Sequence, residues 1–203
     1  MNNFIQEFFL LDPGLCDEII EFFKDNTEYH TKGKLILSDD IIPDNVNEKG
    51  TCGIHKSSTD ITFNIESLND GSFPCHKAIK PLKQYFFELN NFLQQYLMRY
   101  RFANAVPEFK IREGVNIQWY KPYEGFRGLH HEASNENGLN RYLLFFTYLN
   151  TVKDAPTEFL YHDYMCEAIQ GKMLICPAGW THTHRGIISP TQDKYVITGW
   201  FSF

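Results

Sequence analysis

Two short segments, far apart in the chain, carry imidazole and carboxylate groups whose spacing suits a metal ion. His130 and Glu132 are two residues apart, so on extended backbone their side chains project to the same side. His184, in the second segment, supplies another imidazole. Two histidines and one carboxylate that leave one face of an octahedral ion open are the ligand set of non-haem Fe(II) oxygenases. The sequence therefore predicts His130, Glu132 and His184 as metal ligands and as the catalytic centre.

Lys194 adds a cation to the second segment. It follows His184 by ten residues and lies in an otherwise apolar run. A lysine buried without an anion is very costly, so a bound carboxylate explains it better than chance does. The alternative is a lysine at the start of a strand whose ammonium reaches solvent along its aliphatic stem. We expect Lys194 to bind the distal carboxylate of an anionic cosubstrate.

These groups belong to two longer motifs. Residues 120–132 are YKPYEGFRGLHHE and residues 179–200 are GWTHTHRGIISPTQDKYVITGW. Here the chain resembles the Fe(II)/2-oxoglutarate dioxygenases of the prolyl 4-hydroxylase type, including small bacterial and phage-encoded members. The resemblance covers roughly residues 110–203, with a weaker echo in the first half. It implies Fe(II) as cofactor, 2-oxoglutarate and O2 as cosubstrates, and ascorbate as a stimulant.

The resemblance also implies roles for residues around the ligands. Tyr120 and Tyr148 match positions that place hydroxyls on the cosubstrate, and Tyr148 is the better match. Thr198 and Trp200 match positions beside the iron and the cosubstrate. Arg141 matches a position near the substrate opening. Otherwise each tyrosine is an ordinary core residue, and an arginine at a strand edge is usually solvated.

Three other histidines compete for a role at the metal. His182 precedes His184 by two residues, but the ten-residue spacing to Lys194 favours His184. His131 lies between the two ligands of the first segment, and we expect it to face away from them as a structural or exposed residue. His162 is expected to lie at the periphery.

The chain departs from the family pattern at two places. Relatives usually have Gly-Gly ahead of the residues that match Thr157 to Phe159, whereas residues 154–156 here are Asp-Ala-Pro, so we expect a turn with different backbone angles. The first carboxylate is Glu132 rather than the commoner aspartate. Because a carboxylate is kept, hydroxylation is favoured over halogenation.

The first half of the chain predicts helices and loops. Residues 15–26 and 77–100 carry apolar side chains at helical spacing, and the longer helix is expected to pack on a sheet with Pro81 in its first turn. Residues 31–74 are rich in Asp, Asn, Gly and Ser. We expect loops and one or two strands there, and we favour a partial lid over a substrate, with poorly ordered loops as the alternative.

After residue 108 the apolar period changes to two, which predicts strands. In residues 194–201, Lys194, Thr198 and Trp200 share one face, and residues 141–150 are apolar on both faces, as in a central strand. The pattern predicts an α+β fold, a double-stranded β-helix (jelly roll) with N-terminal helices packed on the outer sheet. We expect one domain over residues 1–203, with helical and irregular support in 1–107 and catalytic strands in 108–203.

Composition narrows the class of protein. An aromatic content of 16% and 22% charged residues in 203 positions are typical of a folded globular chain. The five cysteines lack zinc-site spacing and favour reduced thiols in a cytoplasm, the host's if the protein is phage-encoded. No signal peptide or membrane span is recognisable. A net charge of -6 argues against nucleic-acid binding.

Together these features predict an Fe(II)- and 2-oxoglutarate-dependent dioxygenase that hydroxylates an unactivated C–H bond. By resemblance, the substrate is a prolyl residue of a peptide or protein. An oxygenase acting on a free amino acid or another small molecule is the alternative, with an alkylated nucleobase least favoured. Outside catalysis, a cupin-like jelly roll that binds a metal or ligand, or a peptide-binding module, remains open. So does the oligomeric state.

Overall fold

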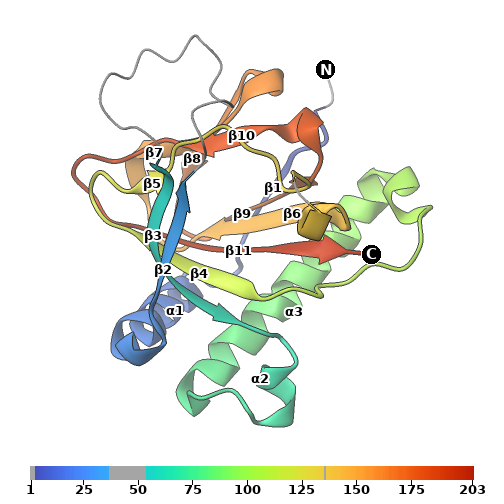
Figure 1. Cartoon of the computed structure of the whole chain (residues 1–203). Coiled ribbons are helices and arrows are strands. Elements are labelled where there is room, and N and C mark those ends of the chain that lie inside the picture. The colour runs from blue at the N-terminus through green and yellow to red at the C-terminus, as the bar shows by residue number, and fades with distance from the viewer. Residues whose placement is uncertain (1–2, 37–53, 135) are drawn as a thin grey trace.

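Antiparallel strands dominate the fold, in a computed structural model that describes residues 3–36, 54–134 and 136–203. The larger sheet has eight strands (Figure 1). In spatial order these are β1 (Gln6–Phe9), β9 (Lys172–Pro177), β6 (Arg141–Tyr148), β11 (Lys194–Ser202), β4 (Val115–Tyr120), β3 (Ile54–Phe63) and β2 (Thr31–Ile36), with β5 (Gly125–Phe126) also paired to β3. A smaller sheet has the order β10 (His184–Gly186), β7 (Val152–Phe159) and β8 (Tyr164–Ala168).

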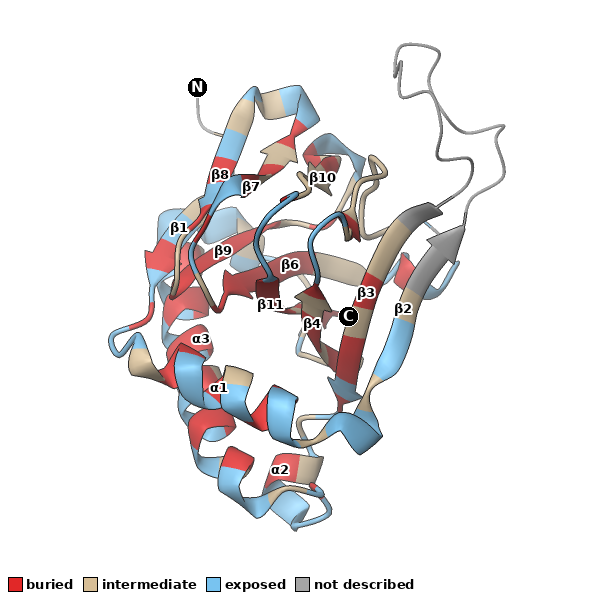
Figure 2. Ribbon diagram, turned by 90° about the vertical axis from the view of Figure 1, so that its left-hand side faces the viewer, coloured by how far each residue is buried: buried red, intermediate tan, exposed pale blue. Residues whose placement is uncertain are grey.

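Helices cover one face of the larger sheet. They are α1 (Gly14–Asp25), α2 (Ser67–Asp70) and α3 (His76–Arg99). Single 3-10 turns complete the path at Thr27–Tyr29, Arg101–Asn104, Glu136–Gly138, Leu160–His162 and Trp180–His182. Figure 2 shows the buried stripes of α1 and α3 turned towards the sheet. None of the helices in the described ranges is long and apolar enough to cross a membrane.

The alternation of side chains along the strands separates two cores. Ile117, Phe145 and Ile197 point towards the helices and join the larger core. Their neighbours on the other face, including Leu144, Phe146 and Val196, pack towards the smaller sheet. The result is a curled antiparallel sheet with a second sheet opposite, which confirms the predicted α+β jelly roll with helices on its outer face.

Several details differ from the sequence-based expectations. The one or two strands expected in residues 31–74 are confirmed as β2 and β3, whereas β1, a further strand of the larger sheet, was not expected. Pro81 lies in the second turn of α3, since that helix begins at His76. Residues 154–156 do not form a turn but continue β7, whose pairing with β8 shifts register between Val152 and Thr157.

Two expectations extend beyond the described residues. The predicted lid includes residues 37–53, which lie outside them, while its remaining parts form β2, β3 and α2. Cys52 also lies outside, and the other four cysteines are free thiols. The single-domain boundary of 1–203 stays a prediction.

Candidate metal and cosubstrate site

The backbone brings the two ligand segments together directly. The N–H of His130 donates to the carbonyl of His184 at 3.0 Å, and the N–H of His184 donates back to the carbonyl of His130 at 2.9 Å. The N–H of Glu132 donates to the carbonyl of Ala178 at the end of β9. These pairings place side chains that are more than fifty residues apart in the sequence on the same side of the fold.

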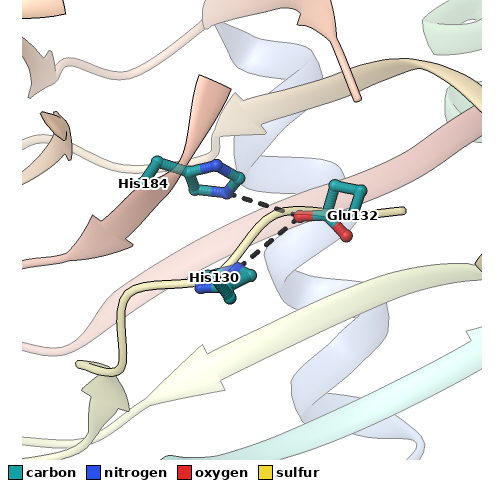
Figure 3. Close-up of side chains that lie close together, drawn as sticks. All are labelled: His130, Glu132 and His184. Atoms are coloured by element: carbon teal, nitrogen blue, oxygen red, sulfur yellow. Dashed lines mark ion pairs between the residues drawn. The ribbon is translucent and has the colours of Figure 1, made fainter. Parts of the chain in front are cut away.

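His130, Glu132 and His184 form the cluster that the sequence predicted as metal ligands. One atom from each lies within 4.8 Å of the others. Glu132 Oε1 is 3.6 Å from His130 Nε2 and 3.4 Å from His184 Nε2, and Figure 3 shows both rings aimed at this oxygen. Two donor atoms at right angles around an ion about 2.1 Å away lie about 3 Å apart, so the cluster needs little adjustment to hold one. The donor set fits the expected metal.

Hydrogen bonds set both imidazoles in the tautomer that a metal requires. The Nδ1 atoms of His130 and His184 lie 2.9 Å from the carbonyl oxygens of Gly128 and His182. A carbonyl only accepts, so each Nδ1 carries the proton and each Nε2 keeps its lone pair. The ring of Phe126 stacks on His130 with 3.5 Å between centroids and fixes its plane. The two nitrogen donors are therefore preorganised.

The charges of the cluster also favour a cation. Burial alone raises the pKa of Glu132, but when the rings of His130 and His184 are protonated, their hydrogen bonds and charges outweigh it and hold this pKa well below its usual range. Burial, helped by the charge of His184, lowers the pKa of His130. An ionised carboxylate beside a neutral imidazole is the protonation state in which both bind metal.

Lys194 lies at the other end of the same cavity. It is 4% exposed, and Nζ donates to the carbonyls of Ala155 and Ile187, each at 3.3 Å. Burial lowers its pKa to about 8, while the nearby charge of Asp154 acts in the opposite direction. In the described part of the chain no carboxylate lies within ion-pair distance of Nζ. Among the described residues, Lys194 therefore has no direct ion-pair partner, and the charge of Asp154 does not outweigh its burial.

Two buried tyrosines line the cavity. Tyr120 is the register partner of Lys194, and its hydroxyl donates to Gln118 Oε1 at 2.8 Å. The hydroxyl of Tyr148 donates to Thr157 Oγ1 at 2.7 Å. Burial raises the pKa of both phenols well above 10, so both remain neutral hydrogen-bond donors.

Of the remaining predicted residues, Trp200 and Arg141 contact Glu132, whereas Thr198 bonds to the backbone of β6. Trp200 Nε1 donates to Glu132 Oε2 at 2.8 Å, and Arg141 Nη1 lies 3.5 Å from the same oxygen. Thr198 Oγ1 donates to the carbonyl of Phe145. All nine predicted site residues line one cavity of about 280 Å³, slightly below the range of typical small-molecule sites.

The other histidines are placed differently. His182 Nε2 donates to the carbonyl of Asn3 at 2.9 Å, and its ring lies 4.5 Å from that of His162, away from the cluster. Burial lowers the pKa of His182 to about 4. His131, expected to face away from the ligands, instead lines the cavity. Only a single bridge pairs this segment, so strict alternation does not apply to it.

Sequence reasoning missed several cavity residues. Asn116 and Gln118 occupy the polar face of VNIQWY, and that face was the available signal. Thr157, Phe126 and Ser134 also line the cavity, but no spacing or composition marked them. They depend on pairings between distant strands.

The fold is shared with solved prolyl hydroxylases. A viral collagen prolyl hydroxylase from Paramecium bursaria Chlorella virus-1, solved with 2-oxoglutarate, matches 98% of this chain and 95% of its own at 12% identity, with a TM-score of 0.63. A Pseudomonas putida prolyl-4-hydroxylase matches 98% and 91% at 10% identity, with a TM-score of 0.61. A Trichoplax adhaerens prolyl hydroxylase, in complex with a hypoxia inducible factor peptide fragment, matches 99% and 84% at 12% identity, with a TM-score of 0.64.

Sequence comparisons add nothing to this, since neither protein-family models nor curated protein sequences give a significant match. Identities of 10% to 12% to the three structures carry the architecture and not the substrate. Those structures span nearly the whole chain and share its helix-covered antiparallel sheet. The chain therefore has the fold of the prolyl hydroxylase-like 2-oxoglutarate oxygenases.

Proposed function

We propose that this chain is an Fe(II)- and 2-oxoglutarate-dependent dioxygenase that hydroxylates an unactivated C–H bond. One observation carries the proposal: a cluster of two histidines and one glutamate shares a cavity with an otherwise unpaired, buried lysine. A metal site alone fits many proteins. A metal site and a buried cation in one small cavity fit a short dicarboxylate that chelates the metal at one end.

His130, Glu132 and His184 would hold the ion through two Nε2 atoms and Oε1. When bound, Fe(II) supplies the oxidative chemistry in which O2 and 2-oxoglutarate are consumed, succinate and CO2 are released, and one oxygen atom enters the substrate as a hydroxyl. The protein supplies orientation and exclusion of water. Phe126 beside His130 and Phe159 beside His184 form apolar walls at the ligands.

Lys194 would bind the distal carboxylate of 2-oxoglutarate. Its Nζ already lies 5.5 Å from the centre of the Tyr120 ring and 3.3 Å from the carbonyls of Ala155 and Ile187. A carboxylate there would replace weak 3.3 Å contacts with a charge-assisted hydrogen bond. Neutral Tyr120 and Tyr148 can add donors without adding charge.

The substrate is proposed to be a prolyl residue in a peptide or protein. The neighbours of this fold are prolyl hydroxylases, and one of them is in complex with a peptide fragment. A cavity of this size admits one side chain of a peptide, and the rest of the peptide would then lie on the rim of the cavity. The resemblance of the two motifs to that family is the basis for proposing ascorbate as a stimulant and O2 as the oxidant.

Anaerobic titration of the metal-free protein with Fe(II) and 2-oxoglutarate tests the cofactor assignment. We expect the visible charge-transfer band of the chelate in the wild type and none in His184→Ala. His182→Gln is the matched control, because His182 is also buried but bonds to Asn3. A band that survives in His184→Ala and is lost in the control would transfer the ligand role to His182.

Absence of the band in well-folded wild-type protein would refute the dioxygenase assignment and leave a non-catalytic, cupin-like jelly roll. With the band present, proline-containing peptides and free proline are incubated aerobically, and a mass increase of one oxygen atom is sought. Hydroxylation of free proline alone would move the proposal to a small-molecule oxygenase.

A further inference from the structure

The two carboxylate oxygens of Glu132 have different surroundings. Oε1 faces the Nε2 atoms of His130 and His184. Oε2 accepts a hydrogen bond from Trp200 Nε1 at 2.8 Å and lies 3.5 Å from Arg141 Nη1. Figure 3 shows one oxygen between the two rings and the other turned away from both. The carboxylate is therefore fixed in rotation by partners on its far side.

Arg141 is itself held in place from several directions. Its Nε donates to Glu113 Oε1 at 2.9 Å, its Nη2 donates to Glu113 Oε2 at 2.5 Å, and its Nη1 donates to the carbonyl of Glu132 at 3.2 Å. The guanidinium lies 3.6 Å from the centre of the Trp200 ring. Ser202 Oγ donates to Glu113 Oε1. Each of the three nitrogens of Arg141 thus has an acceptor on Glu113 or Glu132.

This arrangement answers a problem that a glutamate ligand creates. Glutamate has one more rotatable bond than aspartate, so its carboxylate can turn and chelate an ion through both oxygens. A second oxygen from Glu132 would occupy one of the three positions that 2-oxoglutarate and O2 need. An indole N–H and a guanidinium on Oε2 compete with that rotation, because hydrogen bonds to a charged acceptor are strong.

We propose that Trp200 and Arg141 are positioning residues that keep Glu132 a one-oxygen ligand, and that Glu113 contributes by fixing Arg141. The inference rests on the proposed function, since it concerns the same metal. It assigns Arg141 to the ligand carboxylate rather than to the substrate opening. Glu113, in the segment just before β4, becomes part of the site although it does not touch the cluster.

Three substitutions separate this role from general packing. Trp200→Phe keeps an aromatic ring under Arg141 and removes the N–H donor. Glu113→Gln keeps the shape of the side chain and weakens its hold on Arg141. Glu158→Gln is the matched control: Glu158 pairs with Arg185 at 2.6 Å and is exposed to a similar degree, 28% against 30% for Glu113, but within the described ranges no contact links it to Glu132.

Two anaerobic measurements are compared in each protein. The first is the affinity for Fe(II) alone, from competition with a metallochromic chelator. The second is the 2-oxoglutarate concentration at which the charge-transfer band reaches half of its full intensity. We expect Trp200→Phe to need about 10- to 100-fold more 2-oxoglutarate with a much smaller change in Fe(II) affinity. Glu113→Gln should shift in the same direction by less. Glu158→Gln should match the wild type.

Equal weakening of Fe(II) and 2-oxoglutarate binding in Trp200→Phe would overturn the proposal, because it would indicate general loosening of the pocket. Unchanged values in Trp200→Phe would also overturn it, and a Glu113→Gln protein that matches the Glu158→Gln control would remove Glu113 from the site. Thermal unfolding of each variant identifies any that fails to fold. No band in the wild type refutes the proposed function instead, so the two failures are distinguishable.

Discussion

Replacement of Lys194 by methionine should make the cosubstrate-free protein gain stability relative to the wild type at neutral pH and lose that gain in alkali. Lys194 is buried, and burial lowers its pKa from 10.5 to about 8. A difference of this size corresponds to about 3 kcal/mol, at about 1.4 kcal/mol for each pH unit. Methionine has nearly the same length and carries no charge, so it avoids this cost.

Part of the gain is offset at every pH. The variant loses two hydrogen bonds to the carbonyls of Ala155 and Ile187, each worth about 1 kcal/mol. The net gain of Lys194→Met below pH 8 is therefore about 1 kcal/mol. The change with pH does not depend on this offset and provides the sharper test.

The sign follows from the protons that each state binds. Below about pH 8 the lysine is protonated in both the folded and the unfolded wild type, so the full cost of burial is present. Between pH 8 and 10.5 the unfolded chain holds a proton that the folded protein has released, so wild-type stability rises with pH. Relative to Lys194→Met, the wild type should gain about 2 to 3 kcal/mol between pH 7 and pH 10.

Urea unfolding of both proteins at several pH values between 7 and 10, without metal or cosubstrate, measures this difference, because other titrations are common to both. A stability difference that stays constant over this range would refute the reasoning and would mean that the ammonium is compensated within the protein. Lys172→Met is the control: Lys172 is 5% exposed but lies 3.3 Å from Glu7 Oε1, so its removal should lower stability at pH 7.

Three further outcomes follow from the same contacts. In the iron-loaded wild type, 2-oxoglutarate binding should weaken by up to about tenfold for each pH unit above 8, because the Lys194 ammonium group loses its proton. Calorimetric titration from pH 7 to 9.5 measures this affinity, and a flat profile would contradict the prediction. Tyr148→Phe should lower the free energy of unfolding by about 1 kcal/mol through loss of the Thr157 contact, measured by urea unfolding, whereas an unchanged midpoint would remove that contact from the account. Gly199→Ala should lower the free energy of unfolding by about 1 to 3 kcal/mol, since a Cβ there would lie 2.5 Å from Phe145 Cζ. A thermal unfolding midpoint equal to that of the wild type would show that the Phe145 ring can move.

The sequence predicted best those parts of the site that lie on strands with regular alternation. Lys194, Thr198 and Trp200 occur at even spacing and all line the cavity, while Tyr195 and Ile197 join the helix-side core, as the pattern required. This succeeds because side-chain direction in a strand depends only on local geometry. His130 and Glu132, the proposed ligand pair, also lie together as their two-residue spacing predicted, although the described part of the chain pairs that segment only through a β-bridge.

The parts that were missed depend on contacts that no local pattern encodes. β1 has four residues and pairs on one side only, so its sequence QEFF carries too few alternations to mark a strand. Glu113 joins the site through Arg141, 28 residues later, and nothing in the sequence links the two. His131 was misplaced because alternation was extended into a segment that is not a regular strand. The first two errors concern pairing between distant residues, and the third concerns local backbone geometry.

The register of β11 joins stability and chemistry in one strand. Its odd-numbered side chains Tyr195, Ile197 and Phe201 fill the helix-side core, while its even-numbered ones form one wall of the cavity. A shift of one residue against β4 and β6 would move Lys194 and Trp200 into the apolar core and bring Tyr195 and Ile197 into the site. Burial of Tyr195, Ile197 and Phe201 in the helix-side core opposes such a shift. The same register keeps Trp200 in hydrogen-bond contact with Glu132. The core on one face of this strand therefore helps to hold Glu132, a proposed metal ligand, in place on the other.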